Sequence, residues 1–147
     1  MGILIKNQQS LKQLNKIRIE KASRKILSLL KHPSTELSIL FVDDEKMRQL
    51  NADHRGINRT TDVLSFEANI PVGRKTLYPV LGDVVINVQM AASQAKKSGK
   101  NFYDEIYHLL VHGILHLLGY DHEKSKYKSL IMRKKEQEIL DAVKKMG

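Results

Sequence analysis

Strand patterns and helix patterns alternate along this chain, and their order is the feature that most limits its possible folds. Four short apolar stretches predict β-strands, at residues 3–6, 36–42, 63–66 and 83–88. Five longer segments predict helices, at residues 11–31, 44–53, 89–98, 102–118 and 124–145. Because 147 residues suit one core, we expect a single α/β or α+β domain over residues 1–147. The order of the strands does not follow from these patterns.

Capping residues and glycines mark the ends of several predicted helices. Asp43 or Asp44 can cap the second helix, and Asn101 can cap the fourth. Gly99 and Gly119 follow the third and fourth helices as stop signals. The fourth helix therefore begins and ends at defined positions, which matters because it carries the chemistry described below.

The composition excludes several classes of protein. The chain has no cysteine, which rules out disulfides and thiolate metal sites and leaves His, Asp and Glu as strong metal ligands. The longest apolar stretch, Leu109–Leu118, is interrupted by two histidines and a glycine and is shorter than the roughly 18 residues of a membrane helix. The N-terminus lacks the features of a signal peptide. We expect a cytoplasmic protein that does not enter a membrane.

The formal charge of +9 points to an anionic partner, most commonly a nucleic acid. The charge is uneven, because residues 1–35 carry eight Lys and Arg against one acidic residue, whereas residues 36–95 carry six against eight. The alternative is that the Lys-rich helices are simply solvated. Aromatic residues are few and are not interleaved with the basic ones, which argues against a platform that stacks single-stranded bases.

The chemistry is concentrated in residues 112–122. His112 and His116 lie four apart in the fourth predicted helix, so their rings project from the same face and can reach one metal ion. Gly119 tolerates the positive φ needed to turn the chain back, which brings in His122 as a third ligand. Three histidines leave a fourth position for water, the arrangement of a catalytic rather than a structural zinc site. The sequence predicts one zinc ion used for hydrolysis.

Neighbouring residues have more open roles. His108, one turn before His112, can support a ligand, contact substrate or simply pack in the core. The motif spacing also resembles that of metzincin peptidases, which carry a glutamate general base directly after the first histidine. Here that position is Gly113, so peptide hydrolysis is disfavoured.

Three blocks of sequence together resemble the YbeY family of bacterial endoribonucleases, which act as rRNA maturation factors. They are residues 50–66, residues 81–86 and the histidine block at residues 112–122, which is the most specific. Their order and spacing extend the resemblance over most of the chain. The chain departs from the family pattern at Ile57-Asn58 and at Thr60, which affects loop contacts rather than the metal site.

The resemblance implies a zincin-like α+β fold with about four strands in a mixed sheet and about five helices. It also implies zinc on His112, His116 and His122, with Arg55 as a catalytic and substrate-binding arginine. A guanidinium fork suits phosphate, although Arg55 could instead pair with Asp62 or Asp83. The implied partners are RNA, in particular rRNA, and the ribosome or a ribosomal protein.

Further residues in or near the matched blocks are secondary candidates. Arg59 is a weaker candidate for phosphate binding, and Asp121 can either orient a histidine or serve a turn. Thr61, Ser65 and Asp83 have no assigned chemistry, and no residue identifies the general acid. Two rival functions stay open: an RNA- or ribosome-associated factor with a structural metal, and a metal-dependent hydrolase of another substrate.

Overall fold

The computed structural model describes residues 2–68, 79–120 and 125–146, and within them it has four strands and five helices. The strands are β1 (Ile3–Gln8), β2 (Glu36–Val42), β3 (Val63–Glu67) and β4 (Val80–Asn87). The helices are α1 (Lys16–Leu29), α2 (Asp44–Arg55), α3 (Val88–Ser98), α4 (Phe102–Leu117) and α5 (Lys126–Lys144). The expectation of an α+β fold with a four-stranded mixed sheet and five helices is confirmed.

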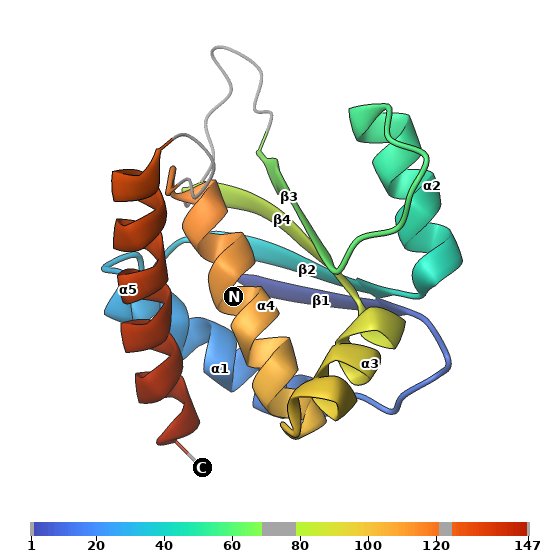
Figure 1. The fold of residues 1–147 in the computed structure, drawn as a ribbon. Coiled ribbons are helices and arrows are strands. Elements are labelled where there is room, and N and C mark those ends of the chain that lie inside the picture. Colours follow the sequence, from blue (N-terminus) through green and yellow to red (C-terminus); the bar gives the residue numbers. More distant parts are fainter. Residues whose placement is uncertain (1, 69–78, 121–124, 147) are drawn as a thin grey trace.

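The sheet has the order β1-β2-β4-β3 (Figure 1). β1, β2 and β4 run parallel, whereas β3 pairs antiparallel with β4 and forms an edge of the sheet. The pairing sets Ser65 opposite Val84 and Phe66 opposite Asp83. This order, which the sequence did not reveal, places the short strand β3 at an edge, where other elements can approach it.

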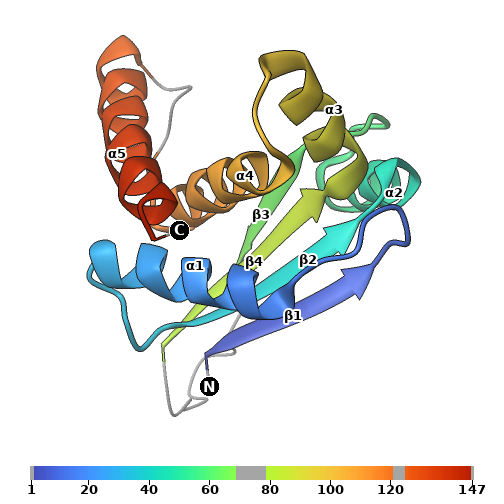
Figure 2. The ribbon, with the colours of Figure 1, turned by 90° about the horizontal axis from the view of Figure 1, so that it is seen from below.

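Successive side chains of β2 and β4 point to opposite faces of the sheet, so the core is divided into two parts. Leu37, Ile39 and Phe41 of β2 belong to the large core, which α1, α3, α4 and α5 also line. Val42 and Val85 face the opposite side and pack in a smaller cluster with Met47 of α2. Figures 1 and 2 show the result: α2 lies on one face of the sheet, and the other four helices lie on the opposite side. Both faces of these strands are therefore apolar, as expected of parallel strands.

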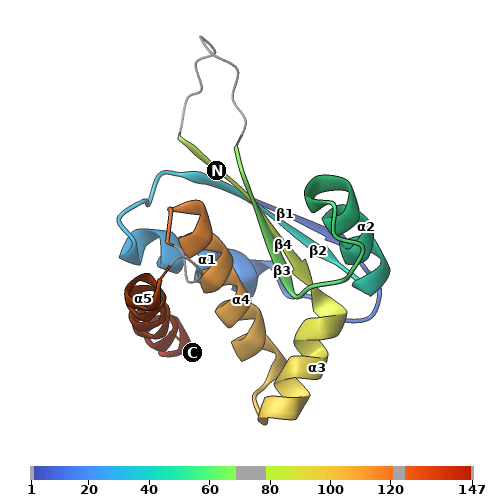
Figure 3. The ribbon, with the colours of Figure 1, turned by 45° about the horizontal axis from the view of Figure 1, so that its top comes forward.

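α4 is the helix around which the large core is built. Ten of its sixteen residues are buried, and it contacts β3, β4, α3 and α5 (Figure 3). Asn101 caps it by accepting a hydrogen bond from the Asp104 backbone N–H at 2.8 Å, as predicted. The rigid central helix thus fixes the position of the histidines that it carries.

Most predicted boundaries lie within three residues of the observed ones, but the first helix is shorter than predicted. It begins at Lys16 rather than Leu11, because the Gln9 side chain holds the backbone N–H groups of Leu11 and Lys12 in a turn and Asn15 caps the helix. The Asp43 side chain caps α2, which extends to Arg55 before Gly56 ends it with positive φ. The loop predicted at residues 69–79 lies almost wholly outside the described residues. In the part of the chain that is described, no helix is long and apolar enough to cross a membrane.

Candidate functional site

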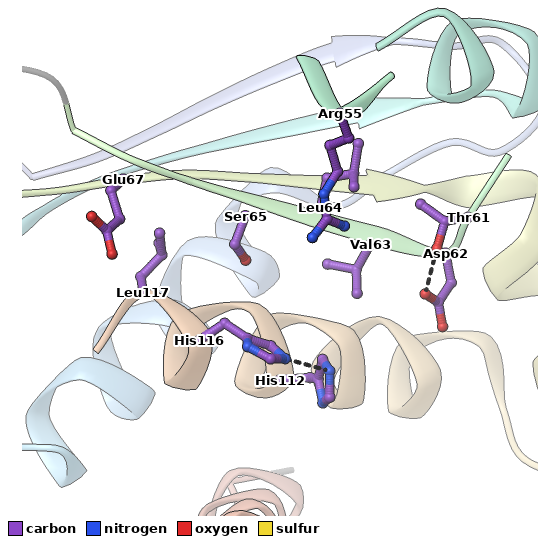
Figure 4. A pocket seen from close by; sticks show the side chains of 10 residues that line it. All are labelled: Arg55, Thr61, Asp62, Val63, Leu64, Ser65, Glu67, His112, His116 and Leu117. Atoms are coloured by element: carbon purple, nitrogen blue, oxygen red, sulfur yellow. Dashed lines mark hydrogen bonds between the residues drawn. The ribbon is translucent and has the colours of Figure 1, made fainter. Parts of the chain in front are cut away.

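A polar pocket of about 450 Å³ lies between α4, the edge strand β3 and the C-terminal end of α2 (Figure 4). Its lining combines His112 and His116, the first two histidines of the predicted metal motif, with residues of the first matched block. The lining residues are Arg55, Thr61, Asp62, Val63, Leu64, Ser65, Glu67, His112, His116 and Leu117. Segments separated by about fifty residues in the sequence therefore meet at one site.

His112 and His116 project from the same face of α4, as their spacing predicted, and their rings converge in the pocket (Figure 4). The two Nε2 atoms are 3.0 Å apart. Two imidazole nitrogens bound tetrahedrally to one zinc ion would lie about 3.3 Å apart. The donor type and the convergence of the two nitrogens therefore fit a shared metal ion.

The chain leaves α4 directly after the second of these histidines. Leu118 ends the helix, and Gly119 has a φ of +94°, the left-handed conformation predicted for it. The Tyr120 N–H then bonds back to the Leu115 carbonyl at 3.0 Å. His122 and Asp121 follow this turn but lie outside the described residues, so their roles stay predictions. Among the described residues, no group of three His, Cys, Asp or Glu side chains gathers to hold a metal.

Glu136 of α5 contacts the histidine face of α4. Its Oε2 lies 2.7 Å from His112 Nδ1, and its Oε1 lies 2.9 Å from His108 Nε2. Burial of Glu136 opposes its ionisation, but the hydrogen bonds with His108 and His112 outweigh burial and lower its pKa from 4.5 to about 2. The carboxylate is therefore ionised and hydrogen-bonds to two histidine rings that lie one helical turn apart.

His108 does not join the other two histidines in the pocket. Its Nε2 faces Glu136, and its Nδ1 lies 3.5 Å from the buried carboxylate of Glu105, a charge contact rather than a well-formed hydrogen bond. The carboxylates of Glu105 and Glu136 together outweigh burial and raise the pKa of His108 from 6.5 to about 9. Both ring nitrogens of His108 are thus directed at carboxylates. Its predicted role in supporting a metal ligand stays a prediction.

Gly113 allows α4 to approach the sheet closely. A Cβ at this position would lie 2.7 Å from Val84 Cγ1 and 3.2 Å from Ser65 Oγ. The Ser65 hydroxyl in turn donates a hydrogen bond to the Gly113 carbonyl at 2.9 Å. Ser65, to which the sequence assigned no chemistry, thus joins β3 to α4 beside the histidines.

Arg55 reaches the same pocket from the C-terminal end of α2. Figure 4 shows its side chain extending past β3 toward the face of α4 that carries His112 and His116. Among the described residues, Arg55 forms no ion pair with Asp62 or with Asp83, the two partners considered in the alternative role. Asp62 and Thr61 line the pocket, whereas Asp83 and Arg59 are not among its lining residues.

Two buried asparagines hold the loop that joins Arg55 to β3. Asn51 of α2 donates to the Arg59 carbonyl at 2.7 Å. Asn87, which caps α3, donates to Thr60 Oγ1 at 3.0 Å, to the Thr61 carbonyl at 3.1 Å and to the Asp44 carboxylate. These bonds fix the path of residues 56–62 and with it the wall of the pocket.

Sequence reasoning missed Asn51, Asn87 and Glu136. Asn51 bonds to a loop residue eight positions on, and Asn87 acts on a segment more than 25 residues away. Glu136 lies 24 residues after His112 in a helix with many charged residues. Asn87 lies in the predicted strand at residues 83–88, two positions before the predicted helix at 89–98, so an asparagine near the helix start gave a local signal for a cap. Its bonds to Thr60 and Thr61 had no such signal.

Comparisons with known proteins match nearly the whole chain. The family model described as "Endoribonuclease YbeY" matches residues 4–144. Proteins named "Endoribonuclease YbeY" include one from Sulfurihydrogenibium, 41% identical over 95% of this chain and 90% of its own length. The protein of that name from Aquifex aeolicus is 40% identical over 91% of this chain and 87% of its own length.

A solved structure has a similar fold. The solution structure of TM1509 from Thermotoga maritima matches with a TM-score of 0.65 and 26% identity, and it covers 96% of this chain and 88% of that one. The sequence blocks that suggested the resemblance are thus embedded in a match along most of the chain. On the strength of the family model and these relatives, the chain belongs to the YbeY endoribonuclease family.

Proposed function

We propose that this member of the YbeY family is a zinc-dependent endoribonuclease that cleaves rRNA phosphodiester bonds during ribosome maturation. The endoribonuclease role follows from membership of the family. The observation that supports a metal-dependent mechanism is the pocket lined by His112, His116 and Arg55, in which the two histidine Nε2 atoms lie 3.0 Å apart. These three side chains combine metal ligands with a phosphate-binding group.

The donor set suits zinc. Two imidazoles on one helical face, with His122 as the proposed third ligand after the Gly119 turn, supply the nitrogen ligands that zinc accepts, and the chain has no thiolate. When bound, zinc supplies Lewis acidity that polarises a phosphate oxygen and stabilises developing negative charge. The protein's own part is to fix both rings on the rigid helix α4.

Arg55 binds the RNA backbone in this proposal. Its guanidinium presents planar paired donors that match two oxygens of a phosphate, and it enters the pocket from the side opposite the histidines (Figure 4). The asparagine-held loop keeps Arg55 and the pocket wall in place. A phosphate held between Arg55 and the two histidines is thereby oriented for attack.

The structure gives a physical reason to disfavour peptide hydrolysis. A metzincin-type glutamate at position 113 would have to point from the face of α4 that packs on the sheet, where a Cβ would already meet Val84 Cγ1 at 2.7 Å. The general base of that peptidase class therefore has no room in this fold.

Metal content and RNA cleavage, measured together, test the proposal. We expect about one zinc per chain by elemental analysis of tag-free protein, and loss of zinc in His116→Ala. Chelation should abolish cleavage of an rRNA fragment, and added zinc should restore it. The rival, an RNA-associated factor with a structural metal, predicts that chelation lowers stability but that no zinc-dependent cleavage is ever seen.

The net charge supports RNA as the proposed partner. The formal charge of +9 favours RNA, and we propose that the protein acts in the cytoplasm on the ribosome or with a ribosomal protein. RNA affinity should fall steeply as salt rises, because phosphate contacts release counterions. A flat salt response would contradict this electrostatic contribution. Co-sedimentation with ribosomal subunits at low salt tests the ribosomal partner.

A further inference from the structure

Glu136 lies outside the pocket lining but makes a short contact with His112, a proposed metal ligand. Its side chain crosses from α5 to α4 and is only 16% exposed. Its Oε2 meets His112 Nδ1 at 2.7 Å, and its Oε1 meets His108 Nε2 at 2.9 Å. Each carboxylate oxygen therefore has its own imidazole partner, which restrains the carboxylate in two directions.

The contact with Glu136 determines which nitrogen of His112 faces the pocket. A carboxylate oxygen accepts hydrogen bonds, so His112 Nδ1 carries the hydrogen that it donates. Nε2 is then the nitrogen with a lone pair for a metal, and it is the atom that lies 3.0 Å from His116 Nε2. A histidine that binds a metal through one nitrogen commonly donates its other N–H to a carboxylate in this way.

His108 completes the support from the other side. Its Nε2 holds the second oxygen of Glu136, and its Nδ1 lies near the buried carboxylate of Glu105. Glu105, His108, Glu136 and His112 thus form a continuous chain of polar contacts between α4 and α5. This chain ties the orientation of the His112 ring to the packing of the two helices.

We propose that Glu136 is a positioning residue for the metal site, which orients His112 so that its Nε2 is presented to the ion, and that His108 holds the carboxylate in place. This inference rests on the proposed function, because it requires that His112 binds a metal. Glu136 acts through His112 and does not itself touch the ion or the RNA.

Zinc affinity, measured by competition with a chromophoric chelator, tests the role of Glu136. Glu136→Ala should bind zinc about 10–100-fold more weakly than the wild type, the usual effect of removing such a carboxylate. Glu136→Gln should lie between the two, because the amide oxygen can still accept from Nδ1 but lacks the charge. Glu138→Gln is the matched control, because Glu138 lies on the same helix, is 69% exposed and contacts only Lys135 in the described structure.

Ring-nitrogen NMR shifts of His112 in the zinc-loaded protein give a second readout. The wild type should show a protonated Nδ1 and a metal-bound Nε2, and Glu136→Gln should show exchange broadening of the Nδ1 proton, because the neutral amide accepts a weaker hydrogen bond. This measurement also serves if Glu136→Ala fails to fold, since Gln has nearly the same size as Glu.

The possible results separate this inference from the proposed function. Wild-type zinc affinity in folded Glu136→Ala, or wild-type zinc affinity together with an unchanged His112 signature in Glu136→Gln, would overturn the positioning role while leaving the metal site intact. Wild-type protein that binds no zinc at all would instead overturn the proposed function, and the positioning role would fall with it.

Discussion

Arg55 is the single residue whose removal should separate RNA cleavage from metal binding. Its side chain enters the pocket from α2, whereas the metal is proposed to bind on α4. Arg55→Ala should lower the rate of RNA cleavage by about 100-fold, since it removes a charged donor to the reacting phosphate. Zinc content should stay at the wild-type level. Arg55→Lys should recover only part of the activity, because Lys lacks the planar fork.

Arg59 provides the matched control for Arg55. It lies in the loop that follows Arg55 and is exposed, as Arg55 is, but it does not line the pocket. Arg59→Ala should cleave RNA at close to the wild-type rate. If Arg55→Ala loses zinc or unfolds, or if the two variants are equally impaired, Arg55 has no specific role in phosphate binding.

Gly113 is a residue whose lack of a side chain is required by packing. Gly113→Ala should lower the free energy of unfolding by about 1–3 kcal/mol through overpacking, partly offset by roughly 1 kcal/mol of helix propensity. The main obstacle is Val84 Cγ1, 2.7 Å from the added Cβ. The cost of Gly113→Ala should therefore shrink in a Val84→Ala background. Urea unfolding of the four proteins tests this, and an equal cost in both backgrounds would show that Val84 is not the obstacle.

The asparagines that cap α3 and α4 differ in the other hydrogen bonds that their side chains form. Asn101 caps α4 and otherwise bonds only to Asp104 within the described structure. Asn87 caps α3 and also holds Thr60 and Thr61 of the pocket loop. Asn101→Ala should cost about 1 kcal/mol, the usual value for a lost cap.

Asn87→Ala should cost more than Asn101→Ala. It removes the cap and also leaves partly buried acceptors on Thr60 and Thr61 without their donor, which adds about 1 kcal/mol. It should also lower RNA cleavage, because the loop between Arg55 and β3 loses its anchor, while Asn101→Ala retains activity once it is folded. Equal losses of stability in the two variants would mean that the bonds from Asn87 to the loop contribute nothing net.

The pairing of His108 with two carboxylates makes the free energy of unfolding of the protein depend on pH. Folding raises the pKa of His108 from 6.5 to about 9, because Glu105 on α4 and Glu136 on α5 favour the protonated ring over the opposing effect of burial. The stabilisation is therefore fully present below pH 6.5 and is lost as pH rises through about 9. Glu136, whose pKa is lowered to about 2, stays ionised throughout this range.

Urea unfolding of chelator-treated protein between pH 6 and pH 9.5 measures this effect. The difference in free energy of unfolding between the wild type and His108→Gln should be largest at pH 6 and should shrink toward pH 9.5. Working without metal avoids competition between protons and zinc for the neighbouring histidines. A difference that does not change with pH would indicate that His108 contributes by packing alone.

The local structure and the spacing of the two helix histidines follow from short-range features of the sequence. The alternation of strand and helix patterns, the Asn101 cap, the Gly119 turn and the four-residue spacing of His112 and His116 are local properties of the backbone. Such features depend on residues within a few positions of each other, so they can be read without knowledge of the fold. The start of α1 was misplaced because a local side-chain turn at Gln9 competes with the apolar period.

Which distant segments come into contact depends on the tertiary structure and is not visible in the sequence patterns. The antiparallel placement of β3 beside β4 brings Arg55 and Ser65 to the histidine face of α4, and the packing of α5 on α4 brings Glu136 to His112. These contacts depend on strand order and helix packing, which are set by the burial of many apolar side chains at once. The spacing of the two proposed metal ligands is therefore a local property of α4, whereas the groups that orient and complete the proposed site come from α2, β3 and α5.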